Sequence, residues 1–470
     1  MLFPTAEFAL FFLIILLVSW LGNDRREVWK TLMLLASYFF YGYWNWSLLG
    51  LIIGSTVFNH CIGVLVRPAA THPHRKKWLV VGMVGNLGVL GWFKYYNFFA
   101  ASTRDLFQTF GVSVPLPHLD ILLPVGVSFI TFQAMSLVMD AYRGTLKEHP
   151  SLLDTAVFIA FFPQLVAGPI LRAADFLPQI MRPSSREAID IGRAALLILG
   201  GLFKKIVVAN ALSSMLVDPV FSEPEAYSGL LSWLAVYGYA VQIYCDFSAY
   251  SDIAIGVALL MGLRFNLNFD APYLSSSLRD FWRRWHVSLS SWLRDYLYIP
   301  LGGSRGGDWL TSRNLVLTFL LGGLWHGAAW TFIVWGVVHG VWLTVERLWL
   351  RRYEATCSGP LWRLARGLIT FHVVCFSWLF FRSQTFADAA AMLKGMFSAG
   401  NGEELPGAPV YVLLAIGFLM QFADGTRARR LWDGFNRLHW FAQGALASLA
   451  ITLILALGPR GVAPFIYFQF

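Results

Sequence analysis

Charged residues are scarce in this chain, and their scarcity excludes an ordinary soluble domain. Asp, Glu, Lys and Arg make up 13% of the 470 residues and hydrophobic residues 57%, against about 25% and about 45–50% in a typical soluble protein. The apolar residues form long runs, such as 8–21, 79–93 and 230–243, for which lipid is the natural solvent. We expect an all-α, polytopic membrane protein with roughly ten to twelve spans of about 20 residues each, in a single domain over residues 1–470.

Closely spaced cysteines and familiar catalytic motifs are also missing. Cys61, Cys245, Cys357 and Cys375 form no CxxC pair, so they indicate neither a disulfide framework nor a zinc site, and we interpret them as packing residues. The patterns HExxH, Walker A and GxGxxG after a strand do not occur, and the GxSxG string at 302–306 follows no predicted strand. Hydrolases, kinases and dehydrogenases therefore lose their usual sequence support, and we predict no metal site.

The basic residues that the chain does have are concentrated in short loops between apolar runs. The formal net charge is +9, and such loops in a membrane protein lie in the cytoplasm and face anionic lipid. We therefore expect membrane lipid, and not nucleic acid, as their partner. The loops at 25–30, 67–77, 347–352 and 427–430 then place both termini on the outer side. The first apolar run lacks a basic leader and a clear cleavage site, so we expect it to remain as the first span.

Two regions do not read as straight spans. The block 157–170 contains Pro163, Gly168 and Pro169 and has basic residues on both sides, so it predicts a broken segment that enters and leaves on the same face. The segment 263–313 alternates arginines with tryptophans and tyrosines. It predicts an amphipathic helix that lies in the membrane interface or lines a funnel.

His326 is the first candidate for chemistry. Only 33 residues separate Arg313 from Arg347, whereas two spans and a turn need about 40, so this hairpin must be short or broken, and the glycine-rich stretch 321–327 is the predicted break. His326 lies 13 residues beyond Arg313, about 20 Å along a helix and past the middle of a hydrocarbon core about 30 Å thick. An ionisable group at that depth is a functional-site hypothesis.

The alternative for any membrane histidine is a neutral ring that hydrogen-bonds between helices, and we assign His339 and His60 to that class. His286 follows Arg283, Arg284 and Trp285 and is a second candidate, although an interfacial histidine beside arginines is usually only solvated. A histidine suits general-base work on a hydroxyl because its ordinary pKa is near neutral.

Other polar residues interrupt the apolar runs. Asp246, Ser248, Ser251 and Asp252 follow one another within ten positions, and they indicate a hydrogen-bonded network between helices more than direct catalysis. Lys204 and Lys205 stand in another apolar run and receive no assignment.

Several stretches together resemble one family, the membrane-bound O-acyltransferases. Trp325-His326-Gly327 resembles the family's signature histidine motif, and residues 281–286, FWRRWH, resemble the segment that carries its second polar position. Residues 123–129, 246–254 and 298–303, together with 162–170 that includes Ala167, are similar to the bacterial branch of the alginate O-acetylation protein and the teichoic acid D-alanyl transferase. These stretches span most of the chain in the family's order.

The resemblance implies a ring of tilted helices with re-entrant segments and a central funnel that reaches the histidine. It implies His326 and His286 as catalytic residues. The residues that it implies for binding donor or substrate are Arg283, Arg284, Trp285, Trp325, Asp246 and Ser248. The arginines of 279–313 could hold the phosphates of coenzyme A, or only anchor the chain at the membrane.

The resemblance further implies O-acetylation of an exported polysaccharide of the alginate or cellulose type. Acetyl-CoA would be the donor substrate, with no tightly bound cofactor. The acyl group would pass to a periplasmic or membrane-anchored partner acyltransferase of the SGNH-hydrolase type within a polysaccharide secretion complex. The chain would lie in the bacterial inner membrane with periplasmic termini. The alternatives are D-alanyl transfer to teichoic acid and a non-enzymatic transporter, which buried Asp, His and Lys residues would also suit.

Overall fold

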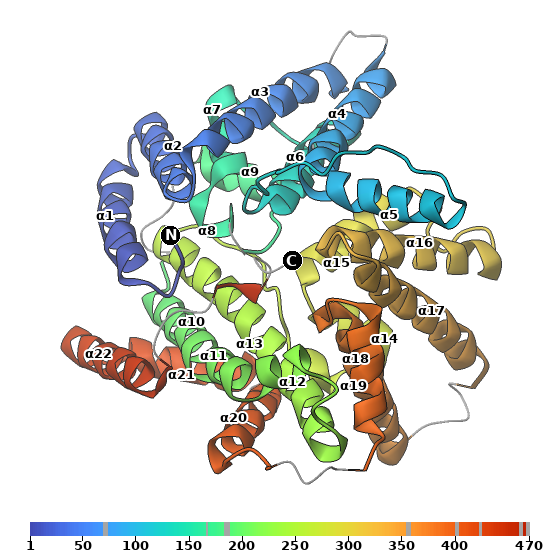
Figure 1. Ribbon diagram of the computed structural model, residues 1–470. Helices are drawn as coiled ribbons and strands as arrows, with labels where there is room; N and C mark the ends of the chain where they lie inside the picture. The colour runs from blue at the N-terminus through green and yellow to red at the C-terminus, as the bar shows by residue number, and fades with distance from the viewer. Residues whose placement is uncertain are drawn as a thin grey trace. The chain divides into compact units, whose positions relative to one another are not determined.

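The computed structural model describes residues 1–68, 74–165, 168–182, 189–353, 359–399, 404–422, 425–459 and 464–466 (Figure 1). Throughout these residues the regular structure is helical, with no β-strand, so the predicted all-α class is confirmed. Ala167 and Cys357, which entered the sequence analysis, lie outside the described residues, as does the side chain of Arg427. The chain forms two compact units. The single domain predicted over residues 1–470, the ring of helices and the central funnel stay predictions.

The first unit comprises Met1–Ile189 and Ala258–Phe265. Its α-helices are α1 (Ala6–Gly22), α2 (Arg26–Gly42), α3 (Leu49–Val66), α4 (Arg75–Leu90), α5 (Tyr96–Thr109), α6 (Val127–Arg143), α7 (Leu152–Ala160), α8 (Phe162–Leu165) and α9 (Ala173–Met181). Helices α3, α4 and α6 pack on one another, with Ile62, Val66, Val138 and Ala141 buried among them. Helix α7 ends at Ala160 and α8 begins at Phe162, so the break predicted in 157–170 is confirmed.

The second unit comprises Asp190–Val257 and Asn266–Phe470. It begins with one long, uneven helix made of α10 (Ile191–Leu202), the π-helical η4 (Phe203–Ala209), α11 (Asn210–Leu212), the π-helical η5 (Ser213–Val217) and α12 (Asp218–Ser222). Helix α13 (Gly229–Leu260) follows, and its last three residues belong to the first unit. The remaining α-helices are α14 (Leu278–Arg284), α15 (Val287–Leu293), α16 (Asp308–His326), α17 (Trp330–Tyr353), α18 (Pro360–Arg382), α19 (Phe386–Met396), α20 (Ala408–Leu419), α21 (Gly425–Asn436) and α22 (Trp440–Leu457).

Five helices in the described residues are long and apolar enough to cross a membrane. They are Trp46–Val66, Ile191–Ser222, Gly229–Leu260, Pro360–Arg382 and Trp440–Leu457, with Ala6–Gly22 and Ala408–Phe422 as shorter apolar helices. This number is smaller than the ten to twelve spans expected. The difference arises because several apolar runs fold as helices shorter than a full span: α1 has 17 residues and α20 has 12.

The prediction of one amphipathic helix in 263–313 is wrong. After an extended stretch the segment forms a 3-10 turn at Pro272–Leu274, then α14, α15 and the π-helical η7 (Arg294–Tyr298) before α16 begins. Two residues explain the breaks, because Ala271 and His286 both have a positive φ that no helix accommodates. Trp282, Trp285 and Trp292 are buried rather than turned to an interface.

Candidate active site

Helices α16 and α17 form a tight hairpin that places His326 at its turn (Figure 1). Their backbones approach closely because glycines face them: a Cβ on Gly323 would lie 2.2 Å from the Phe332 carbonyl oxygen, and one on Gly336 would lie 2.2 Å from that of Phe319. Helix α16 runs through Gly322 and Gly323 and ends at His326. The predicted break is therefore confirmed, and it lies at Gly327. Gly322 and Gly323 are inside the helix, where the absence of a side chain allows close packing.

The His326 ring is enclosed by aromatic side chains. It is 4% exposed, and its ring centroid lies 5.0 Å from Trp325, 4.9 Å from Trp335 and 5.2 Å from Phe381. Trp325 lies near the end of α16, Trp335 lies on α17 and Phe381 lies on α18, so three helices supply these rings. Such a setting is dry, and a dry site strengthens every polar interaction made within it.

His286 lies between α14 and α15, fully buried and in an unusual backbone conformation. Its φ is +43°, a left-handed conformation that costs an L-residue about 1–2 kcal/mol and that is often associated with function. Its Nδ1 lies 3.2 Å from Oδ1 of Asn268, and the Phe247 ring packs edge-on at 4.6 Å. Burial lowers the pKa of His286 to about 3, so the ring is neutral at physiological pH.

The structure brings the two candidate histidines close to one indole ring. The Trp325 ring centroid lies 6.2 Å from that of His286 and 5.0 Å from that of His326. The candidate site thus consists of two buried imidazoles that both contact the Trp325 ring. It lies where the α14–α15 turn meets the α16–α17 turn.

The predicted donor-binding residues separate into two groups. Trp285 is 1% exposed and stacks on Phe281 at 5.5 Å, next to Trp378 at 5.2 Å, so it belongs to the same aromatic cluster as Trp325. Arg283 is exposed, and Arg284 is half-buried with its Nε 3.1 Å from Oδ1 of Asp280. The structure therefore places the two tryptophans with the histidines and the two arginines on the surface of α14.

Asp246 and Ser248 belong to a network between helices. Asp246 Oδ1 lies 2.7 Å from Lys205 Nζ, and its Oδ2 accepts a 2.8 Å hydrogen bond from the backbone N–H of Ile466. Lys204 donates to Ser248 Oγ at 2.8 Å and pairs with Asp252 at 2.5 Å. This arrangement fits the network interpretation, and it gives both unassigned lysines a partner. Direct substrate binding by Asp246 and Ser248 stays a prediction.

His339 and His60 lie in hydrogen-bonded positions that suit a structural role. His339 Nε2 is 2.9 Å from Ser377 Oγ on α18, and its Nδ1 accepts from the Trp282 indole N–H at 3.3 Å. His60 Nδ1 is 3.1 Å from Thr155 Oγ1 in the first unit. Both rings join neighbouring helices, as expected for neutral histidines in a membrane protein.

Sequence reasoning missed Asn268, Trp335 and Phe381. Asn268 is fully buried, and Trp335 and Phe381 are each 1% exposed. The only sequence feature that could have indicated Asn268 is an amide flanked by leucine and phenylalanine in 266–269. Trp335 and Phe381 sit in ordinary apolar runs, so nothing in the sequence distinguishes them from lipid-facing aromatics.

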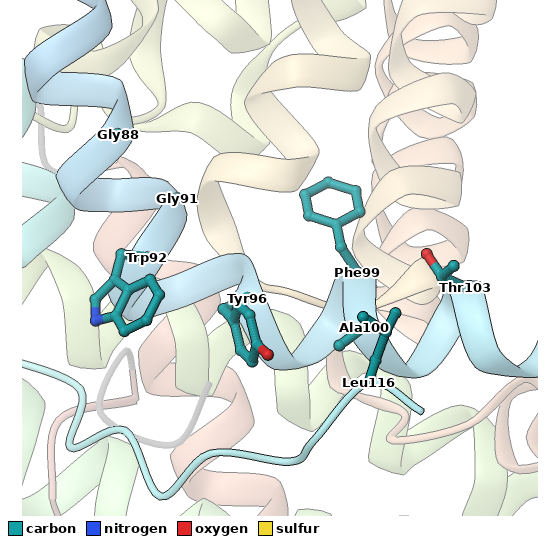
Figure 2. A pocket seen from close by; sticks show the side chains of 8 residues that line it. All are labelled: Gly88, Gly91, Trp92, Tyr96, Phe99, Ala100, Thr103 and Leu116. Atoms are coloured by element: carbon teal, nitrogen blue, oxygen red, sulfur yellow. The ribbon is translucent and has the colours of Figure 1, made fainter. Parts of the chain in front are cut away.

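Open cavities in the described residues have linings that include neither His326 nor His286. One, of about 380 Å³, lies in the first unit between α4, α5 and the loop after α5, and is lined by Gly88, Gly91, Trp92, Tyr96, Phe99, Ala100, Thr103 and Leu116 (Figure 2). Another, of about 480 Å³, lies between α17 and α18 and is lined by Val338, Trp342, Leu368, Ile369, His372, Val373 and Phe376. Both linings are mainly apolar. Within the described parts of the chain, no three His, Cys, Asp or Glu side chains gather as metal ligands.

Comparison with known proteins gives a family match over most of the chain. The model of the membrane-bound O-acyltransferase family matches residues 39–387. A probable alginate O-acetylase of Pseudomonas aeruginosa is 41% identical over 90% of this chain and 82% of that protein. A peptidoglycan O-acetyltransferase of Helicobacter pylori is 35% identical over 80% of this chain and 75% of its own. A teichoic acid D-alanyltransferase of Bacillus subtilis is 31% identical over 58% and 73%.

Proposed function

Because this chain belongs to the membrane-bound O-acyltransferase family, we propose that it acetylates an exported polysaccharide through chemistry centred on His326. The chain is a multi-pass membrane enzyme, an O-acyltransferase. The observation that carries the proposal is the position of His326. The ring ends α16 at a glycine turn and is enclosed by Trp325, Trp335 and Phe381, and the His286 imidazole also lies near Trp325.

Acetyl-CoA is the donor in this proposal. The hydroxyl oxygen of the acceptor attacks the thioester carbonyl, a C–O bond forms and the C–S bond breaks. His326 takes the hydroxyl proton and returns it to the departing thiolate, so the imidazole ends neutral. The aromatic enclosure excludes water, which would otherwise hydrolyse the thioester. Arg279 and Arg283 are exposed on α14 and would pair with the phosphates of coenzyme A.

The polysaccharide is of the alginate type in this proposal, because the probable alginate O-acetylase of Pseudomonas aeruginosa covers nearly the whole chain. A cellulose-type polymer is the second possibility for the acceptor. The chain would lie in the bacterial inner membrane with both termini in the periplasm. It would deliver the acetyl group to a partner acyltransferase of the SGNH-hydrolase type within a secretion complex.

The test is acetyl transfer from radiolabelled acetyl-CoA by purified protein in liposomes. Loss of a general base typically costs 10²–10⁴-fold in rate, so we expect His326→Gln to lower transfer by at least about 100-fold. His118→Gln is the matched control, because His118 is exposed in the first unit. If His326→Gln is folded and transfers acetyl at the wild-type rate, the assignment of His326 is wrong.

The same assay separates the alternative donors. Transfer from acetyl-CoA but not from a D-alanyl carrier-protein thioester supports the proposal. The opposite result would favour D-alanyl transfer to teichoic acid, the reaction named in the Bacillus subtilis relative.

A further inference from the structure

The short stretch before α14 runs alongside the turn that carries His286. The backbone N–H of Val287 donates to the Asn268 carbonyl at 2.9 Å, and the N–H of Asp270 donates to the Arg284 carbonyl at 2.9 Å. These two hydrogen bonds fix the backbone on both sides of His286. The Asn268 side chain, which is fully buried, is thereby held next to the imidazole.

The orientation of the Asn268 amide follows from its neighbours. Its oxygen lies 3.2 Å from the backbone nitrogen of Ser288 and 2.9 Å from Ser288 Oγ. A backbone N–H only donates, so the group that faces it must be the amide oxygen and not the NH₂. The NH₂ group points the other way and donates to Ser251 Oγ on α13 at 3.0 Å.

A fixed acceptor determines which nitrogen of His286 carries the proton. Nδ1 lies 3.2 Å from the same Asn268 oxygen, and two lone-pair atoms cannot hydrogen-bond to each other, so Nδ1 must be the donor. In a neutral ring the lone pair then resides on Nε2. The tautomer of His286 is thus set by an amide on another segment of the chain.

We propose that Asn268 is a positioning residue of the acyl-transfer site, which holds His286 with its proton on Nδ1 and its basic lone pair on Nε2. The proposal rests on the proposed function, since it gives His286 the part of a second proton acceptor near Trp325, which also lies next to His326. The acceptor hydroxyl or the thiol of the donor would meet Nε2 only in this tautomer. The strained φ of His286 is a further sign that the ring orientation is maintained by its surroundings.

The charged groups on the neighbouring elements have their own partners. On α13 Asp246 precedes Phe247 and is paired with Lys205, and Asp252 follows Ser251 and is paired with Lys204. On α14 Arg283 is exposed and Arg284 is paired with Asp280, and after α15 Arg294 is paired with Asp295. On α16 the His326 ring centroid lies 5.0 Å from that of Trp325, and the other charged groups of this helix, Asp308 and Arg313, stand in its first two turns. The Asn268 amide oxygen and the Ser288 hydroxyl lie 3.2 Å and 3.4 Å from Nδ1 of His286.

The first test reads the tautomer without any activity. Solid-state NMR of histidine-labelled protein in lipid bilayers distinguishes the two neutral tautomers, and His286→Gln identifies the signal by its loss. We expect a proton on Nδ1 in the wild type and a detectable Nε2–H population in Asn268→Leu. An Nε2–H tautomer in the wild type, or an unchanged tautomer in Asn268→Leu, would overturn the proposal even if acyl transfer proceeds through His326.

The second test uses the pH dependence of transfer. Asn268→Asp keeps an acceptor for Ser288 but places a carboxylate against the imidazole, which raises the pKa of His286. Because the pKa of His286 is about 3 in the wild type, His286 does not set the wild-type acid limb. Asn268→Asp should therefore add a new loss of transfer on the acid side of the rate profile, and the acid limb should move to higher pH. The matched control is Asn314→Asp, a fully buried asparagine on α16 that bonds to Gly303 and Arg313.

We expect Asn314→Asp to leave the acid limb in place, and Asn268→Asp to add no shift in a His286→Gln background. A shift in that background, or an equal shift in Asn314→Asp, would contradict the positioning role. If the wild type transfers no acetyl group at all, the proposed function fails, while the NMR result still decides whether Asn268 sets the tautomer.

Discussion

At the scale of single residues, the second unit contains two ion pairs, one of them fully buried, in which two lysines face two aspartates. The Lys205 and Asp246 side chains are 2% and 4% exposed and lie 2.7 Å apart. A buried ion pair contributes little net stability, but the loss of one partner leaves an uncompensated charge. The neighbouring pair of Lys204 and Asp252 is more accessible, with side chains 10% and 20% exposed.

We therefore predict that Asp246→Asn destabilises the protein by about 3–5 kcal/mol, measured as a fall in the midpoint of thermal unfolding in detergent. Asp280→Asn is the control, since its pairing with Arg284 is partly exposed and should contribute at most about 1 kcal/mol.

The double variant Lys205→Met with Asp246→Asn should recover most of the lost stability, because no unpaired charge remains and the asparagine oxygen still accepts from Ile466. If the double variant is stable but inactive, Asp246 contributes to substrate binding and the network interpretation is incomplete.

His326 could be predicted from the sequence and Asn268 could not, for a physical reason. An ionisable residue at mid-membrane depth is conspicuous because lipid penalises it, and the distance from Arg313 gives that depth. An asparagine in an extended stretch gives no comparable signal in the sequence. Its importance comes from a hydrogen bond to a residue 18 positions away, and a single sequence contains no information on that contact.

At the scale of elements, the α16–α17 hairpin depends on the absence of side chains at three points. A Cβ on Gly340 would lie 2.7 Å from the Val316 Cα, in addition to the backbone clashes at Gly323 and Gly336. Lipid supplies no hydrophobic drive between helices, so close packing of this kind is what holds the pair together. The position of His326 relative to Trp335 depends on it.

We predict that Gly336→Ala lowers both the unfolding temperature and acetyl transfer, because the new Cβ would meet the backbone of Phe319 and push α16 away from α17. Gly200→Ala is the matched control, as it also lies in a helix but has open space around the added atom. Normal activity in Gly336→Ala would mean that the site tolerates displacement of α16.

The sequence predicted the helix breaks that prolines and glycines cause. It did not predict the breaks at other residue types. Prolines and glycines predicted the interruption of 157–170 and the turn at Gly327. By contrast, 263–313 read as one amphipathic helix, because nothing about Ala271 or His286 as residue types forecasts a positive φ. Tertiary hydrogen bonds impose that conformation, so local pattern alone could not find it.

At the scale of the whole molecule, composition was sufficient to place the protein in a membrane. Many large apolar side chains are exposed along the helices, for example Leu10, Leu17 and Leu21 on α1 and Leu453, Leu455 and Leu457 on α22. In water such surfaces would aggregate, whereas in lipid they are satisfied. The number of spans was harder to predict, since hydropathy does not distinguish a full crossing from a shorter apolar helix.

The distribution of basic loops predicts the orientation, and cysteine labelling tests it. The basic loops at 25–30 and 67–77 place the turn between α2 and α3 on the outer side. In a background without native cysteines, Asn45→Cys in that turn should react with a membrane-impermeant maleimide in cells whose outer membrane is permeabilised. Lys77→Cys, in the loop predicted to be cytoplasmic, should react only after the inner membrane is opened. Labelling of Lys77→Cys in intact spheroplasts would reverse the proposed periplasmic position of the termini.

The aromatic enclosure of His326 has an optical consequence. The ring centroids of Trp285 and Trp335 lie 5.2 Å and 6.1 Å from that of Trp378, and indoles at such separations share their excited states. The protein should therefore have a strong near-ultraviolet circular dichroism band that originates at the candidate site. Occupation of that site by a thioester would perturb the band, so that ligand entry becomes visible in unlabelled protein.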